Sequence, residues 1–290
     1  MKKNILESEL VLNEDGSIYH LHLLPEDISD TILLVGDQNR VAEISKYFDK
    51  VEIVKSKREF ITHTGLIGKK RFTVISTGIG TDNIDIVLNE LDALANIDLK
   101  TRNIKDHFSK LQFIRIGTSG SLQKDIPVDS MVASSHGLGL DSLMNFYSIN
   151  YSEHELELQK EMNKQLQLDF VNAYVVQSQG SLLNKFADLT NGITATCCGF
   201  YGPQGRMLRG EIKTPNLIER LNKINHNGIR VSNFEMETAA IYGLSKLFGH
   251  EALSINAIVA NRITHEFSKD AQQTIDKTIR KVLETLTASN

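Results

Sequence analysis

Three glycine-rich segments each follow a short apolar run, and each carries groups that could bind an oxyanion. They read GDQNR at residues 36–40, STGIG at 76–80 and IRIGTSG at 114–120. Backbone N–H groups in such a turn, with the positive end of a following helix, attract anions, and Arg40 adds a charged donor. None of the segments is a dinucleotide GxGxxG or a Walker GxxxxGK[ST] motif, so cofactor binding loses support.

Arg115 is the one charged residue of the apolar run 111–116. An unpaired guanidinium in such a strand would be costly. A bound anion would neutralise it, with the Thr118 hydroxyl as a second donor, and a structural ion pair with a carboxylate is an equal alternative. Three such turns at strand ends favour an oxyanion, most simply phosphate, because open α/β sheets bind ligands along that edge.

Two carboxylates, Glu235 and Glu237, lie two residues apart in the segment NFEMET, which we expect to open a helix. At that spacing they should point in different directions, so they are not a glycosidase-type acid–base pair. One of them could stabilise the helix N-terminus and the other could accept hydrogen bonds from a sugar diol. Helix capping alone is the competing interpretation.

A fourth segment, FYGPQGR at residues 200–206, combines aromatic rings with a turn and two polar side chains. A planar heterocycle could stack on Phe200 while Gln204 and Arg206 bond its edge. An ordinary exposed turn would have a similar composition. No HExxH spacing, GxSxG elbow or Cys/His cluster is present, so the sequence supports neither a metal site nor a hydrolase triad.

Composition excludes several classes of protein. The chain has 290 residues, 41% of them hydrophobic, which describes a globular, enzyme-sized protein rather than a disordered or fibrous chain. The net charge of −4 argues against a nucleic-acid footprint. The N-terminus lacks an apolar signal region and no run approaches 18 apolar residues, so we expect a soluble, cytoplasmic protein with no membrane partner.

The elements that must position these groups alternate between short apolar runs and amphipathic segments. Strands are predicted at residues 32–36, 50–54, 61–66, 72–76, 111–116, 130–133, 173–177 and 253–259. Helices are predicted at residues 41–48, 82–95, 153–168, 215–224, 235–248 and 271–286. Strands separated by helices imply βαβ units and a mixed, mostly parallel sheet flanked by helices. We predict one α/β domain over residues 1–290, with an N-terminal extension to about residue 17, and a solvated helix and loop at 98–110.

Seven motifs in order give a resemblance over about residues 18–262. They are GDQNR, KREF, STGIG, FIRIGTSG, FYGPQGR, NFEMET and VANR. Together they resemble the nucleoside phosphorylase family, whose α/β fold has a distorted, barrel-like central sheet. The FYxxQxR segment resembles the uracil-binding loop of the branch that acts on uridine rather than the purine enzymes' pocket.

The resemblance implies a role for each matching residue. The implied phosphate ligands are Gly36, Arg40, Arg58, Arg115 and Thr118. The implied ribose ligands are His20, Thr118, Glu235, Met236 and Glu237. The implied base ligands are Phe200, Gln204, Arg206 and Arg262. Arg115, Gln204 and Arg206 are the implied catalytic residues, and His20 and Arg58 match residues donated to the site of a neighbouring subunit.

The implied reaction is reversible phosphorolysis of uridine to uracil and α-D-ribose 1-phosphate, in pyrimidine salvage, with deoxyuridine or thymidine as further candidate substrates. Inorganic phosphate is the co-substrate and no cofactor is expected. Shared sites imply a homo-oligomer, at least a dimer. The residues Thr81-Asp82-Asn83 replace the bacterial Gly-Pro-Ser, which weakens the case for a monovalent cation at Glu59, Ile79 and Asn83. The alternatives are a purine nucleoside phosphorylase, which would place an acid within residues 260–264, a hydrolytic nucleosidase, and a non-catalytic nucleoside-binding protein.

Overall fold

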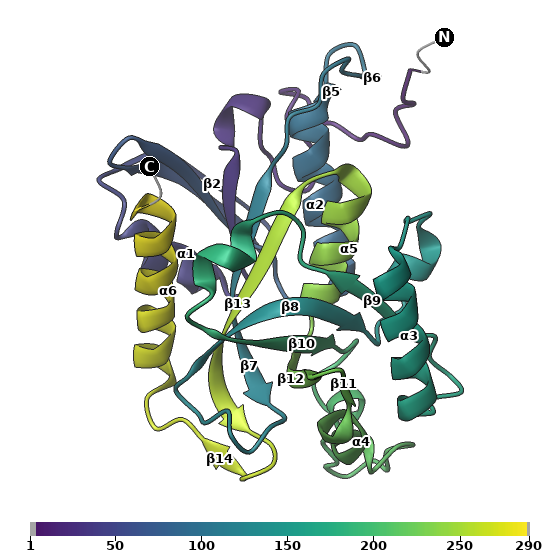
Figure 1. Cartoon of the computed structure of the whole chain (residues 1–290). Helices are drawn as coiled ribbons and strands as arrows, with labels where there is room; N and C mark the ends of the chain where they lie inside the picture. Colours follow the sequence, from purple (N-terminus) through teal and green to yellow (C-terminus); the bar gives the residue numbers. More distant parts are fainter. Residues whose placement is uncertain (1–3, 289–290) are drawn as a thin grey trace.

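Five strands close into a ring at the centre of the molecule, in the computed structural model, which describes residues 4–288. The ring runs β7 (Gln112–Ser121), β13 (Glu251–Asn261), β8 (Met131–Gly139), β10 (Thr190–Thr196) and β12 (Ile229–Glu235). An antiparallel pairing of β12 with β7, at Asn233 and Phe234, closes it. The sheet is therefore barrel-like on one side, as expected (Figure 1).

Beyond β7 the same sheet continues as an open layer. It runs through β1 (Thr31–Val35), β4 (Lys70–Ser76), β3 (Phe60–Ile67) and β2 (Lys50–Lys57). Parallel pairing joins β1 to both β7 and β4, whereas β3 and β2 return as antiparallel strands. The remaining strands are short: β5 (Ile97–Asp98), β6 (Asn103–Ile104), β9 (Tyr174–Gln177), β11 (Asn225–His226) and β14 (Glu266–Phe267).

The helices are α1 (Gln38–Ser45), α2 (Thr81–Asn96), α3 (Glu153–Leu166), α4 (Leu217–Lys223), α5 (Thr238–Phe248) and α6 (Ala271–Ala288). Of these, α1, α2, α5 and α6 cover the two faces of the open layer, whereas α3 and α4 pack against β9 and β12. Ile32 and Leu34 of β1 pack with α2 and α5, and the alternate residues Leu33 and Val35 pack with α1 and α6. This alternation is what a strand buried on both faces requires. Figure 1 shows α2 beside α5 at one side of the sheet and α6 at the other.

Most predicted elements are confirmed, with shifts of a few residues at their ends. The predicted strands correspond to β1, β2, β3, β4, β7, β8, β9 and β13, and the predicted helices to α1 through α6. Two differences matter for the site. β7 does not turn after residue 116 but continues to Ser121, and α5 begins at Thr238 rather than at residue 235.

The helix predicted within residues 98–110 is wrong, although the segment is mostly exposed and ends in a loop, as expected. The carboxylate of Asp98 accepts hydrogen bonds from the backbone N–H groups of Lys100 and Thr101, and these bonds favour a turn over a helix. The result is the small hairpin of β5 and β6. The backbone N–H of Ile5 donates to the carbonyl of Arg102, so the N-terminal segment lies against this hairpin.

Strands β10 and β12 were not predicted, because their apolar alternation is short: it rests on Ile193 and Ala195 in β10 and on Ile229 and Val231 in β12. Thr194 and Thr196 of β10 and Ser232 and Asn233 of β12 are buried in the ring and bond to one another or to neighbouring polar groups. These buried polar residues occupy positions where apolar residues would make a buried strand recognisable in the sequence. Within residues 4–288, no helix is long and apolar enough to cross a lipid bilayer.

Candidate active site

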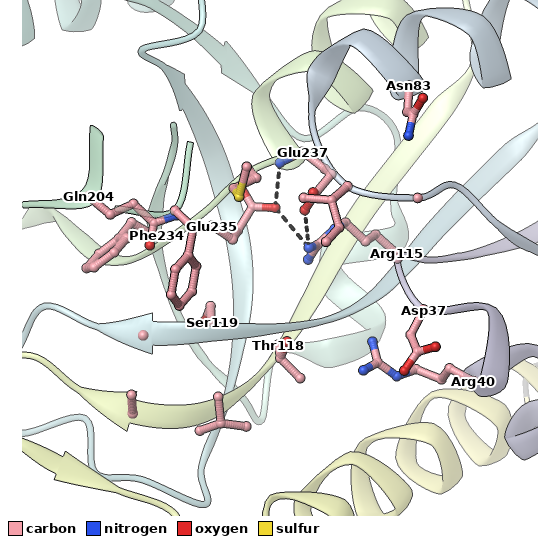
Figure 2. Close-up of a pocket in the computed structure, with 18 of the residues that line it drawn as sticks. Asp37, Arg40, Asn83, Arg115, Thr118, Ser119, Gln204, Phe234, Glu235 and Glu237 are labelled. Atoms are coloured by element: carbon pink, nitrogen blue, oxygen red, sulfur yellow. Dashed lines mark hydrogen bonds and ion pairs between the residues drawn. The ribbon is translucent and has the colours of Figure 1, made fainter. Parts of the chain in front are cut away.

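A cavity of about 830 Å³ opens where β1, β4 and β12 end and β7 passes beneath them. Most of the predicted site residues line it, although they come from six separate places in the chain. The predicted residues on its wall are Gly36, Arg40, Glu59, Ile79, Asn83, Arg115, Thr118, Phe200, Gln204, Arg206, Glu235, Met236 and Glu237. Figure 2 shows Asp37 and Arg40 at one end, Gln204 and Phe234 at the other, and Arg115 between them.

Arg115 is buried at the centre of this wall and pairs with both carboxylates of the NFEMET segment. Its Nη2 lies 2.5 Å from Oε2 of Glu237 and 3.1 Å from Oε2 of Glu235, and its Nη1 donates to Oδ1 of Asn256 at 2.8 Å. The prediction that the two carboxylates diverge is therefore wrong. Glu235 ends a strand and Glu237 lies at the N-terminus of α5, so the change of backbone direction brings both to one guanidinium (Figure 2).

The backbone beneath the guanidinium must be glycine. A Cβ at Gly117 would lie 1.7 Å from Nη1 of Arg115, so any side chain there would displace the arginine. Gly80 has φ +99°, and its N–H donates to Oε1 of Glu237 at 2.8 Å. The second and third glycine-rich segments thus serve to place Arg115 and Glu237 together, which the anion hypothesis for these segments did not anticipate.

Glu235 is fully engaged with the protein. Its carboxylate accepts hydrogen bonds from Oγ1 of Thr196 at 2.8 Å, from the N–H of Glu237 at 2.9 Å and from the N–H of Thr238 at 3.0 Å. Together with the Arg115 pair, these contacts give the Glu235 carboxylate four donors, whereas the Glu237 carboxylate has one donor on each oxygen, the Gly80 N–H and Arg115. Glu237 therefore keeps more capacity than Glu235 to accept hydrogen bonds from a sugar.

One guanidinium cannot neutralise two buried carboxylates. Burial acts to lower the pKa of Arg115, but Glu235 and Glu237 raise it above its ordinary value. Burial also raises the pKa of Glu235 to about 7, with Arg115 opposing and Glu237 reinforcing the increase. The cluster therefore takes up a proton near neutral pH.

We expect Glu235→Gln to remove a pH dependence of stability. The folded-state pKa of Glu235, about 7, lies above its ordinary value of 4.5, so the folded state holds the proton more tightly. Its contribution to stability is fully present below pH 4.5 and is lost as the pH rises through 7. In urea unfolding between pH 5 and 8, the wild-type protein should lose stability relative to Glu235→Gln as the pH rises.

The matched control for this measurement is Glu219→Gln. Glu219 is an exposed residue of α4, and its hydrogen bond with Lys223 lowers its pKa, so it is ionised across the whole range. Its replacement should leave the pH profile unchanged. A wild-type profile parallel to that of Glu235→Gln would contradict the assigned proton.

At the other end of the cavity, Arg40 is the cation left available for an anion. Its Nη1 lies 3.4 Å from the carbonyl oxygen of Ile116, and its buried Nε has no hydrogen-bond partner among the described residues. Burial, and then the charge of Arg115, lower the pKa of Arg40. Asp37 caps α1 through the N–H of Asn39, so the helix N-terminus faces the same space. A negatively charged group here would satisfy Arg40 and offset its repulsion from Arg115.

The opposite end is formed by the loop that holds Gln204 and Arg206. A short 3₁₀ turn at Gly202–Gln204 buries Gln204, and Nη1 of Arg206 donates to Oε1 of Gln204 at 2.6 Å and to the carbonyl of Phe200 at 2.8 Å. The Arg206 guanidinium also lies 3.8 Å above the Phe200 ring. Burial and the neighbouring Arg262 lower the pKa of Arg206 to about 10, so it stays charged at neutral pH.

Three predicted residues do not line the cavity. Arg262 lies behind the loop, where its Nη1 donates to the carbonyl of Gln204 at 3.2 Å. His20 and Arg58 do not line the cavity, but both lie near the Tyr19 ring, whose centroid is 4.8 Å from the His20 ring centroid and 5.9 Å from the Arg58 guanidinium. The two residues matched to subunit donation thus lie near one ring and outside the wall of their own chain's cavity.

Sequence inspection missed part of the wall. The unassigned lining residues include Ser119, Gly120, Phe234, Val259, Ala260 and Phe267. Phe234 lies within NFEMET and has both Arg206 and Arg262 5.6 Å from its ring, so the motif held a usable signal. Phe267 is exposed on β14 and no sequence pattern distinguishes it. Glu59, Ile79 and Asn83 share one wall, with Asn83 close against Gly78.

Comparison with known proteins agrees with this geometry. The sequence model described as "Phosphorylase superfamily" matches residues 30–288. A uridine phosphorylase of Thermococcus kodakarensis is 30% identical over 278 residues, covering 94% of this chain and 88% of the relative. A purine nucleoside phosphorylase of Buchnera aphidicola is 26% identical over 270 residues, covering 92% and 98%. The solved structure of a Trypanosoma brucei nucleoside phosphorylase, described as showing uridine phosphorylase activity, superposes with a TM-score of 0.88 at 30% identity, covering 97% and 100%.

Proposed function

Since the chain belongs to the phosphorylase superfamily, we propose that this phosphorylase cleaves uridine reversibly with inorganic phosphate, giving uracil and α-D-ribose 1-phosphate. The superfamily match and the nucleoside phosphorylase relatives supply the reaction class. The proposal adds which base is cleaved, where each substrate part binds and what each residue contributes.

The main observation in favour of uridine is the pairing of Gln204 and Arg206 at the end of the cavity opposite Arg40. Arg206 uses Nη1 to hold the Gln204 oxygen, so the Gln204 amide nitrogen and Arg206 Nη2, which make no hydrogen bond with the described residues, remain as donors. Two donors side by side suit the carbonyl oxygen edge of uracil. They suit developing negative charge on that base better still.

The residues at the end of β13 argue against a purine substrate. A purine enzyme of this family would use an acid near residues 260–264, and here the side chain of Asn261 is buried and donates to the carbonyls of Gln123 and Ile126. Among the described residues of the cavity wall, the carboxylates are Asp37, Glu59, Glu235 and Glu237. Asp37 caps α1, the two last pair with Arg115, and Glu59 lies beside Gly78, so none accompanies the base loop.

These assignments place the phosphate and the base on opposite sides of the ribose in the cavity. Phosphate binds at Gly36, Arg40 and Thr118 on one side of the ribose, and the base lies against Phe200 on the other. A phosphate oxygen forms the new bond to C1′ while the C1′–N1 bond breaks, and its electron pair leaves with the uracil. Arg206 and Gln204 stabilise the charge on the uracil oxygens, while Glu237 and Met236 hold the ribose. This scheme uses no covalent enzyme intermediate.

The proposal includes a homo-oligomer with shared sites. His20 and Arg58 lie outside the cavity of their own chain, and Arg58 is exposed in the turn between β2 and β3. We assign Arg58 to the phosphate and His20 to the ribose 5′-hydroxyl of a neighbouring subunit. A dimer is the smallest assembly that completes both sites.

The test is uracil release from uridine, with and without inorganic phosphate, with inosine assayed in parallel. Phosphate-dependent release from uridine alone is the expected result. Cleavage of inosine would transfer the chain to the purine enzymes, and phosphate-independent release would make it a hydrolytic nucleosidase. Binding of uridine without release would leave a nucleoside-binding protein.

A further inference from the structure

Glu90, a residue of α2, holds the segment that carries His20. Its Oε1 lies 2.6 Å from Nδ1 of His20 and accepts the His20 backbone N–H at 3.0 Å. Its Oε2 accepts the Leu21 backbone N–H at 2.9 Å. The carboxylate is mostly shielded, with 13% of the Glu90 side chain exposed against 31% of the His20 side chain. One carboxylate thus fixes both the backbone and the ring of the histidine.

This contact decides which ring nitrogen is available. A carboxylate accepts hydrogen bonds, so Nδ1 carries the proton that is donated to Glu90. In the neutral ring Nε2 then has the lone pair and can accept a hydrogen bond from a hydroxyl group. The short ion-assisted bond also prevents the ring from rotating, because rotation would leave the carboxylate without its donor.

The other side of the segment is held independently. Nζ of Lys57 donates to the carbonyl of Tyr19 at 2.6 Å and to Oδ1 of Asn13 at 2.7 Å, and it lies 4.7 Å above the Tyr19 ring. The edge of that ring meets the His20 ring at an interplanar angle of 81°. His20 is therefore fixed between α2 and the end of β2, and the part of its side chain that stays exposed does not line the cavity of its own chain.

α2 links this arrangement to the chain's own site. The helix begins next to Gly80, which donates to Glu237, and its residue Asn83 lines the cavity. Glu90 lies two turns further along the same helix. α2 thus positions Asn83 in the cavity of its own chain and, through Glu90, also positions His20.

We infer that Glu90 is a positioning residue for catalysis in the neighbouring subunit. It holds His20 of its own chain so that Nε2 of that ring is free to accept a hydrogen bond from the 5′-hydroxyl of the ribose bound in the neighbouring subunit. This inference rests on the proposed cleavage of uridine and on its shared site. Glu90 itself does not contact the substrate. Its contribution passes entirely through the histidine.

The experiment compares Glu90→Gln with the wild type on uridine and on 5′-deoxyuridine, which lacks the hydroxyl. We expect kcat/KM for uridine to fall roughly tenfold, the usual scale of a hydrogen bond to a charged group, with no loss on 5′-deoxyuridine. In a His20→Ala background the Glu90→Gln change should cost nothing further, because both act on one contact. Asp85→Asn is the matched control: it changes another α2 carboxylate, whose partners are Tyr147 and Asn89 rather than His20.

Each outcome separates the inference from the function it rests on. Wild-type protein that releases no uracil with phosphate present refutes the proposed function. Active wild type with equal Glu90→Gln losses on both substrates refutes the positioning role, because a general structural defect would not distinguish them. If Glu90→Gln does not fold, ¹⁵N spectra of the wild-type histidines, assigned with His20→Ala, still decide. A proton on Nδ1 of His20 supports the inference, and its absence overturns it.

Discussion

Replacing Arg206 by alanine is expected to lower kcat/KM for uridine by about 100- to 1,000-fold with the fold intact, the range found when one charge-stabilising donor is removed. The guanidinium stays charged at neutral pH and is held against Phe200 and Gln204 at the cavity end assigned to the base. Its loss also removes the donor that fixes the Gln204 oxygen. Steady-state kinetics with uridine and saturating phosphate measure the effect, with circular dichroism as the test of folding.

A second substrate tests whether the loss of Arg206 slows the departure of the base. 5-Fluorouracil leaves more readily as an anion than uracil, so the penalty should shrink with 5-fluorouridine if Arg206 stabilises the departing base. Arg209→Ala is the matched control, because Arg209 is an exposed residue of the same loop and does not line the cavity. Near-normal activity of Arg206→Ala, or an equal loss in Arg209→Ala, would remove Arg206 from the mechanism.

Replacing Arg115 by methionine is expected to abolish activity and to lower the free energy of unfolding by about 3–5 kcal/mol, the cost of breaking a buried ion pair from one side. Glu235 and Glu237 would then face each other in the protein interior without the cation that both contact. Urea unfolding followed by circular dichroism gives the change in stability, and the phosphorolysis assay gives the change in activity.

The companion variant restores one property only. Adding Glu235→Gln and Glu237→Gln to Arg115→Met removes both unpaired charges, so most of the stability should return while the activity remains absent. Arg280→Met, which breaks an exposed pair with Asp276 on α6, is the control and should change stability far less. If Arg115→Met were as stable as that control, the central role of the cluster would be wrong.

The sequence was sufficient for most strands and helices and for many of the residues on the cavity wall. A buried strand such as β1 is recognisable as a run of aliphatic residues. Glycine-rich segments follow β1 and β4, although the third such segment lies within β7. Two strands of the ring, β10 and β12, were harder, since each has only a short apolar alternation next to buried threonine, serine or asparagine side chains that bond to one another. Hydrogen bonds satisfy these polar groups in the interior, so their burial leaves no apolar pattern in the sequence.

The sequence left the environment of Arg115 undecided between an anion and a carboxylate. In the structure Arg115 pairs with two carboxylates, Glu235 at the end of β12 and Glu237 at the start of α5. Both lie some 120 residues further along the chain. No spacing rule predicts that meeting, because it depends on β12 closing the ring against β7. The placement of Glu90 against His20 is equally non-local, with 70 residues between them.

The separation between the closed ring and the base loop also has an evolutionary consequence. Arg115, Gly117, Glu235 and Glu237 constrain one another, so a substitution at one position fails unless others change with it. The loop with Gln204 and Arg206 is stabilised mainly by its own short-range bonds, such as those from the N–H groups of Gln204 and Arg206 to the carbonyl of Tyr201. Under the proposed assignment of this loop to the base, a change of base preference would need substitutions in this loop alone, while the cluster around Arg115 is kept.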